Sequence, residues 1–197
     1  MTNRKPRLKV LLVDDSPERT AILRAALEKA RFDVAAVLES TFALLAAVES
    51  HQPDIIIIDT DSPDRDTLEN LCVVSRDEPR PVVMFTHDGD SEKIRAATEA
   101  GVSAYVVDGM SAERIGPIIG AAIARFEQFQ ALKREFDDIE EKLADRKVIE
   151  RAKGILMKSR NLSEDEAFRA LRTEAMDRNA RLADVARQLV EVAGLLA

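Results

Sequence analysis

The stretch KVLLVDDSPERTAILRAALEKA, residues 9–30, contains the pattern that decides the fold. Its first part, KVLLVDD (9–15), is a short aliphatic run of the length of a buried strand, and it ends in two acids. Its second part, SPERTAILRAALEKA (16–30), predicts a helix, because Ser16 suits the N-cap and Pro17 suits the first turn. A strand that leads directly into a helix is the repeating unit of α/β folds.

The same unit recurs up to about residue 125. Further strands are predicted at 32–37, 54–59, 81–86 and 104–107. Further helices are predicted at 41–50, 67–74, 91–100 and after Ser111. We expect Gly101 to close the helix at 91–100 and Ser111 to cap the helix that follows it. Short strands that alternate with helices predict a parallel sheet with helices on both faces. The fold class is therefore α/β and flavodoxin-like, with a five-stranded parallel sheet.

A long helix is predicted downstream of Pro117, because no turn signal interrupts the following residues. Apolar side chains recur along it in steps of 4, 3, 3, 4, 3 and 4, which is typical of a coiled-coil seam with one short step. The seam consists of Ala122, Phe126, Phe129, Leu132, Phe136, Ile139 and Leu143. It either packs on its own domain or pairs with a second copy. We favour a parallel homodimer, because the run extends well past a single small domain.

The last segment predicts a small all-α domain of three helices. One helix runs through IERAKGILMK (149–158), a second begins at a capping box formed by Ser163 and Glu166, and RLADVARQLVEVAGLLA (181–197) forms a third. We expect Met157 and Met176 to lie in its core. The predicted domains are residues 1–117, 118–144 (a coiled-coil linker helix) and 145–197.

The composition indicates a globular protein of the cytoplasm without membrane-spanning segments. An apolar content of 46% can supply a core, and no aliphatic run approaches the ~20 residues that span a bilayer. A single cysteine, Cys72, excludes an intramolecular disulfide and suits the cytoplasm, and we expect it to be buried. Residues 145–197 contain 11 Lys/Arg and 9 Asp/Glu, so they carry +2 and the preceding residues −9 of the net −7. Nucleic-acid binding is therefore expected only from the C-terminal part.

Asp14, Asp15 and Asp59 end the first and third strands, which we expect to be neighbours in the sheet. Carboxylates brought within ~4 Å of one another repel by about 4 kcal/mol per pair at an effective dielectric of about 20. A hard cation such as Mg²⁺ is one way to compensate this repulsion. The alternative is that Asp14 and Asp15 only cap the following helix.

Residues 8–125 resemble the receiver domain of two-component response regulators. The acid pair, Asp59, Thr86 in VMFTHD and the segment GVSAYVV carry this likeness. The resemblance implies a magnesium site at the acid pair, a phosphoacceptor at Asp59 and a switch residue at Thr86. It also implies a lysine after the fifth strand, where this sequence has Asp108.

Asp108 in place of this lysine disfavours a phosphoaspartate at Asp59, because the site loses a positive charge and gains a negative one. The segment after the third strand, TDSPDRD, adds Asp61 and Asp64. We therefore expect Asp59 to be vestigial and no cofactor to be required, with magnesium left open at the three acids. Slow phosphorylation of Asp59, or a cation supplied by Lys93, is the alternative.

Residues 145 onward resemble the ANTAR domain, an RNA-binding output of transcription antitermination regulators, in ERAKGILM, LSEDEAF, TEAM and RLADVA. The whole chain is most similar to the NasT type, which regulates nitrate and nitrite assimilation genes. This resemblance implies a pseudo-receiver, control by a nitrate/nitrite sensor protein in place of phosphorylation, and binding to stem-loops in leader transcripts. It implies that the chain is not an enzyme and that it binds neither membranes nor DNA.

Lys147, Arg151, Gly154 and Lys158 follow one another in steps of 4, 3 and 4 and so share a helix face. The glycine among these cations lets a ligand approach the backbone. The predicted RNA-binding residues are Lys147, Arg151, Lys153, Lys158, Arg169, Arg172, Asn179 and Arg181. Taken singly, each is equally explained as part of a solvated helix face. A phosphorylation-controlled DNA-binding response regulator and a scaffold that only sequesters its partner are the competing functions.

Overall fold

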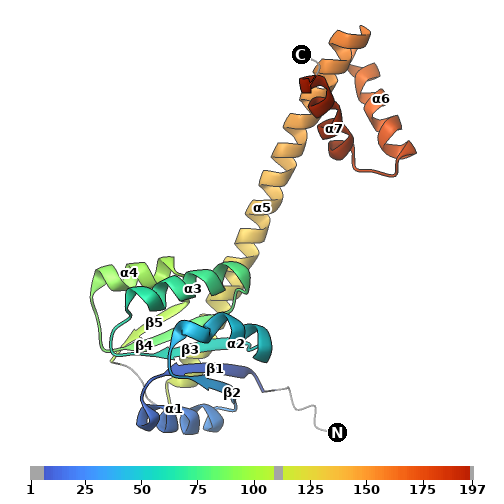
Figure 1. Cartoon of the computed structure of the whole chain (residues 1–197). Coiled ribbons are helices and arrows are strands. Elements are labelled where there is room, and N and C mark those ends of the chain that lie inside the picture. Colours follow the sequence, from blue (N-terminus) through green and yellow to red (C-terminus); the bar gives the residue numbers. More distant parts are fainter. Residues whose placement is uncertain (1–6, 109–112, 196–197) are drawn as a thin grey trace, which may run out of the picture. The chain divides into compact units, whose positions relative to one another are not determined.

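The computed structural model describes residues 7–108 and 113–195 (Figure 1). It divides into two compact units, one that ends at Gln130 and one that begins at Ala131. The elements of the first unit are β1 (Lys9–Asp14), α1 (Pro17–Lys29), β2 (Asp33–Leu38), the 3₁₀ turn η1 (Thr41–Ala43), α2 (Leu44–His51), β3 (Ile55–Asp59), α3 (Arg65–Asp77), β4 (Val82–Thr86), α4 (Ser91–Glu99), β5 (Ala104–Val107) and the start of α5 (Ile115–Arg160). The second unit contains the rest of α5 with α6 (Glu164–Asp177) and α7 (Leu182–Leu195).

The five strands form one parallel sheet in the order β2-β1-β3-β4-β5, which confirms the predicted fold class. β1 and β3 are neighbours, and their register pairs Asp14 with Asp59. The switch in strand order between β1 and β3 is the place where open α/β sheets bind ligands. The sheet therefore brings the first and third strand ends together at that place.

Buried side chains on the two faces of the sheet form two separate cores. α2, α3 and α4 cover one face, and α1 with the start of α5 covers the other (Figure 1). Ile55 to Ile58 of β3 are all buried, and successive residues of the strand contribute to opposite cores. This two-sided burial explains why the central strands are continuous apolar runs with polar residues only at their ends.

Local start and stop signals read from the sequence are confirmed. Ser16 caps α1, and Ser163 with Glu166 forms a complete capping box at α6. Gly101 follows α4 with a φ of 102°, and a Cβ there would lie 1.9 Å from Ser75 Oγ, so only glycine fits. The predicted cap at Ser111 lies outside the described residues.

α5 is one helix from Ile115 to Arg160, so the predicted linker helix and the first helix of the C-terminal domain are a single element. Ala122, the first residue of the seam, is buried in the first unit's core. The boundary between the two compact units also falls inside this helix. The division at residues 117 and 144 stays a prediction. No helix among residues 7–108 and 113–195 has both the length and the apolar character to cross a membrane.

Three burial predictions were wrong, and one of them is Met157, which is 38% exposed on α5 next to the buried Leu156. Cys72 is exposed on α3, because Leu71 and Val74 form the buried side of that helix. Met176 is 71% exposed, since the core of the second unit takes its predecessor Ala175 instead. A side chain one position away from a buried helix residue is rotated by about 100°, which carries it off the apolar face.

Candidate functional site

The carboxylates of Asp14, Asp15 and Asp59, which we call the acidic pocket, lie at the ends of β1 and β3. Asp14 is 3% exposed and Asp59 8% exposed, whereas the side chain of Asp15 is largely in solvent. Asp14 is already satisfied by its own chain. Its Oδ1 accepts a hydrogen bond from the backbone N of Ser16 at 2.9 Å, and its Oδ2 accepts one from the Thr20 hydroxyl at 2.9 Å. Asp14 thus helps to hold the first turn of α1.

Arg19, a residue that the sequence analysis did not single out, supplies positive charge to the acidic pocket. Its guanidinium nitrogens lie 3.4 Å from Asp14 Oδ1, 2.7 Å from Asp15 Oδ1 and 3.7 Å from Asp59 Oδ2. A further nitrogen donates to Asp61 Oδ1 at 2.7 Å. The spacing of four residues between Asp15 and Arg19 was a signal in the sequence, although Asp15 precedes the N-cap Ser16 and is not part of α1. That spacing gives no hint of the contacts to Asp59 and Asp61.

Asp59 is the least satisfied group of the site. Its buried Oδ2 accepts no hydrogen bond from any residue in the described part of the chain. Burial raises the pKa of Asp59, the negative charge of Asp14 raises it further, and Arg19 opposes both effects. The nearby guanidinium therefore only partly compensates the negative charge at Asp59.

A cavity of about 340 Å³ adjoins the acidic pocket between the strand ends, η1 and α3. The described residues that line it include six carboxylates and no lysine, arginine or histidine: Asp14, Asp15, Glu39, Asp59, Asp64 and Asp66. Asp64 also caps α3 by accepting a hydrogen bond from the backbone N of Thr67 at 2.7 Å. Such a lining opposes the entry of a phosphate-bearing donor.

The predicted switch residues lie near the end of β4 and after β5. The Thr86 hydroxyl donates to the carbonyl oxygen of Asp61 at 2.9 Å and accepts from the backbone N of Asp88 at 3.1 Å. Asp108 has a φ of 47° and pairs through Oδ1 with His87 Nδ1 at 2.7 Å. This hydrogen bond raises the pKa of His87. The place expected to hold a lysine thus holds an acid with a histidine as its partner.

Lys93, the alternative source of a cation, is engaged elsewhere. Its ammonium donates to Asp88 Oδ2 and to Ser62 Oγ, both at 2.6 Å. This contact and the Ser62 hydroxyl lower the pKa of Asp88 to about 2. Lys93 therefore neutralises the loop after β4 and makes no ion pair with Asp59.

Magnesium was left open at Asp14, Asp15 and Asp59. No three His, Cys, Asp or Glu side chains within residues 7–108 and 113–195 are arranged so that they could hold a metal ion. Arg19 binds the carboxylates on which such a site would depend. The arrangement as it stands does not fit a magnesium site.

The second unit has a core formed by the end of α5 with α6 and α7. On α5, Lys147, Arg151 and Lys158 surround Gly154, and we call this set the cation face. All three cations are exposed, and none makes a hydrogen bond or ion pair with another described residue. A Cβ placed on Gly154 would meet nothing within 4 Å. Packing inside the chain therefore does not explain the glycine.

The remaining predicted RNA-binding residues lie in different settings. Arg172 is exposed and has no partner among the described residues, and Arg169 donates to the carbonyl oxygen of Asp165 at 3.3 Å. Lys153 is only 7% exposed, and its ammonium lies 2.6 Å from Glu164 and 3.0 Å from Glu150. These ion pairs give Lys153 a structural role, and an RNA contact by it stays a prediction.

Arg181 and Asn179 also have roles inside the second unit. Arg181 binds Glu141 and Asp145, each at 2.8 Å. Asn179 follows the end of α6 with a φ of 48°, a conformation that asparagine adopts more readily than most residues. Both residues are exposed, so RNA contacts remain a prediction for them as well.

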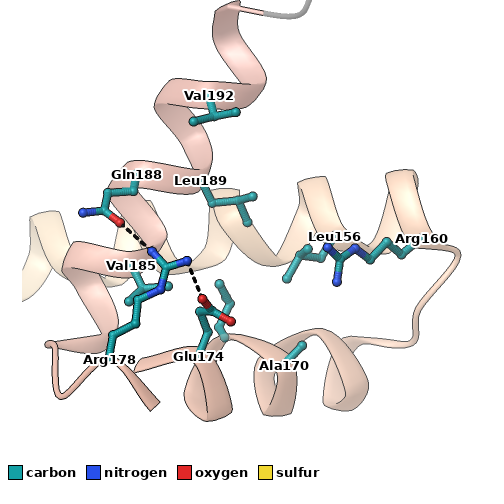
Figure 2. A pocket seen from close by; sticks show the side chains of 10 residues that line it. Leu156, Arg160, Ala170, Glu174, Arg178, Val185, Gln188, Leu189 and Val192 are labelled. Atoms are coloured by element: carbon teal, nitrogen blue, oxygen red, sulfur yellow. Dashed lines mark hydrogen bonds and ion pairs between the residues drawn. The ribbon is translucent and has the colours of Figure 1, made fainter. Parts of the chain in front are cut away.

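A hollow of about 330 Å³ lies between α5, α6 and α7 (Figure 2). Arg178 bridges its polar side by binding Glu174 and donating to Gln188 Oε1 at 3.2 Å. Leu156, Leu189 and Val192 supply apolar lining. Arg178 is therefore engaged within the bundle, in contrast to the cation face.

The predicted seam is buried only at its start. Phe126 is half-buried, and the following members are between 52% and 64% exposed: Phe129, Leu132, Phe136, Ile139 and Leu143. The interpretation that the seam packs on its own domain thus holds for Ala122 and not for these five residues.

Two domain families match the chain. The response regulator receiver domain matches residues 10–119, and the ANTAR domain matches residues 137–190. The transcriptional regulatory protein PdtaR of Mycobacterium tuberculosis is 33% identical over 146 residues, which are 74% of this chain and 71% of that protein.

Two further similarities are narrower. The nitrate regulatory protein of Klebsiella oxytoca is 38% identical over 68 residues, which are 34% of this chain and 17% of that protein. The signal receiver domain of a modulated diguanylate cyclase from Desulfovibrio desulfuricans G20 aligns with a TM-score of 0.55 at 23% identity, over 62% of this chain and 98% of that domain. The second likeness is one of fold alone.

Proposed function

Because this chain belongs to the response regulators that join a receiver domain to an ANTAR domain, we propose that it binds stem-loop RNA and regulates transcription antitermination. The observation that carries the proposal is the cation face on α5. Its three cations are exposed and unpartnered among the described residues, and they surround a glycine that has no packing role. Arginine and lysine can bind phosphates, and arginine can also stack on unpaired bases in a loop.

The proposed regulator is a sensor protein that binds the receiver domain, in place of a phosphoryl group on Asp59. Three features support this. The position expected to hold a lysine is Asp108, Lys93 is bound to Asp88, and six carboxylates line the cavity beside Asp59. Asp59→Ala should then leave antitermination nearly unchanged in a transcription assay. Loss of regulation in this variant would restore the phosphorylation model.

The proposed targets are leader transcripts of nitrate and nitrite assimilation genes, and the proposed sensor responds to nitrate or nitrite. The similarity to the nitrate regulatory protein of Klebsiella oxytoca, although it covers 68 residues, supports this assignment. Transcription of such a leader in vitro tests it. Readthrough of the terminator should increase when the chain is added, and unchanged readthrough would reject these targets.

Fluorescence anisotropy with a labelled hairpin RNA and with duplex DNA of the same sequence, over a salt series, tests RNA binding. We expect the hairpin to bind more tightly and its affinity to fall steeply with salt, because phosphate contacts release counterions. Changing Arg151, Lys158 and Arg172 together to Ala should weaken binding at least tenfold. The slope of log affinity against log salt should fall by about 2, at roughly 0.7 per lost phosphate contact.

The matched control changes three exposed cations of the first unit, Arg24, Lys29 and Arg95, to Ala, which alters the net charge equally. RNA affinity should be close to wild type in this control. Preference for duplex DNA would favour a DNA-binding response regulator. Binding of a sensor protein without any RNA binding would favour a scaffold that sequesters its partner.

A further inference from the structure

The guanidinium of Arg19 lies among four carboxylates at the ends of β1 and β3. It is within 3.7 Å of Asp14, Asp15 and Asp59 and donates to Asp61 at 2.7 Å. Two of these acids, Asp14 and Asp59, are buried. One positive charge thus serves a group of acids that would otherwise need a cation from solvent.

The backbone holds Arg19 in this place. Arg19 is in the first turn of α1, and its backbone N donates to the Ser16 hydroxyl at 3.4 Å. The turn is tied to the sheet by Asp14, which accepts hydrogen bonds from Ser16 N and from Thr20 Oγ1, each at 2.9 Å. The N-cap that starts the helix therefore also aims the guanidinium at the acids.

A divalent ion and this guanidinium compete for the same oxygens. Asp15 Oδ1 accepts from Arg19, and both oxygens of Asp14 accept hydrogen bonds from the chain. A metal ion would have to displace these donors and lie beside a fixed positive charge. With Arg19 in place, no three potential ligands within residues 7–108 and 113–195 are arranged to hold an ion, so an ion can bind only if the acids move when the guanidinium is removed.

We propose that Arg19 is the resident cation of the acidic pocket and takes the place of a divalent metal ion, so that removing its guanidinium creates a Mg²⁺ site at Asp14, Asp15 and Asp59. This inference concerns metal binding by the receiver domain. It does not depend on RNA binding, and its test contains no RNA.

The test measures thermal unfolding and isothermal titration calorimetry of the full chain with MgCl₂, against NaCl of equal ionic strength. Wild type should show no heat of binding and no shift in unfolding temperature up to about 10 mM Mg²⁺. Arg19→Ala should unfold at a lower temperature without metal. It should then gain roughly 3–5 °C with 10 mM Mg²⁺, the shift expected for a site of about millimolar affinity.

Arg24→Ala is the matched control, because Arg24 is an exposed arginine on the same helix without a partner among the described residues. It should behave like wild type. Arg19→Ala combined with Asp59→Asn should lose the Mg²⁺ response, which assigns the response to this pocket. Arg19→Gln replaces Arg19→Ala if the latter does not fold. Binding of Mg²⁺ by wild type, or a folded Arg19 variant that ignores Mg²⁺, would overturn the proposal.

Discussion

Replacing Gly154 with alanine separates the stability of the second unit from its proposed RNA binding. Gly154 lies in the interior of α5 with no positive φ, and a Cβ there would meet nothing within 4 Å. Alanine is favoured over glycine in a helix interior by about 0.8–1.0 kcal/mol. Gly154→Ala should therefore stabilise the fold by about this amount, with no clash to offset the gain.

For a unit of the size of residues 131–197, this gain corresponds to a rise in unfolding temperature of about 4–8 °C. RNA binding should change in the opposite direction. If the backbone at Gly154 approaches RNA between Lys147, Arg151 and Lys158, the new methyl group blocks that approach, and the loss of one or two close contacts weakens affinity about tenfold or more.

The assay pairs thermal unfolding, followed by circular dichroism, with hairpin RNA anisotropy. Gly120→Ala is the control, because Gly120 lies on the same helix and its Cβ would also meet nothing within 4 Å. It should raise stability and leave RNA affinity unchanged. If Gly154→Ala is stabilised and binds RNA as tightly as wild type, RNA does not approach the backbone at this position and the argument from Gly154 fails.

Two further predictions concern the seam and the loop after β4. Leu132→Glu should weaken dimerisation roughly 100-fold, because each of the two copies loses the burial of a leucine worth about 1.5 kcal/mol or more. Ala131→Glu, which lies outside the seam, is the control and should leave dimerisation unchanged. Light scattering over a dilution series measures the oligomeric state, and a monomeric wild type would reject the dimer. Asp88, whose pKa is lowered to about 2 chiefly by Lys93 and Ser62, stabilises the folded chain above about pH 4, and this contribution is lost as the pH falls toward 2. The difference in unfolding temperature between wild type and Asp88→Asn should therefore shrink from pH 6 to pH 2, and a difference independent of pH would contradict this assignment.

The fold was predictable because its signals are local. Ser16, Gly101 and the pair Ser163–Glu166 each fix a helix end within a few residues, and the alternation of strands with helices leaves few topologies. The meeting of Asp14 with Asp59 followed from the same reasoning, since the carboxyl ends of neighbouring parallel strands share one edge.

The counter-ion of that site was not predictable in the same way. Asp15 and Arg19 look like an ordinary ion pair between residues four apart, and only the packing of α1 beside β3 and its following loop adds Asp59 and Asp61. Lys153 is a similar case. Its pair with Glu164 depends on how α6 folds back on α5, so the sequence alone gave no reason to separate it from the exposed lysines.

The left-handed backbone at Asp108 bears on how this receiver domain could evolve. Aspartate tolerates a φ of 47° better than lysine, because its short side chain can form local hydrogen bonds in that conformation. A mutation that placed lysine at this position would meet a strained backbone, and it would also remove the partner of His87. A single substitution at this position therefore does not supply a cation without a cost in backbone strain and the loss of the pair with His87.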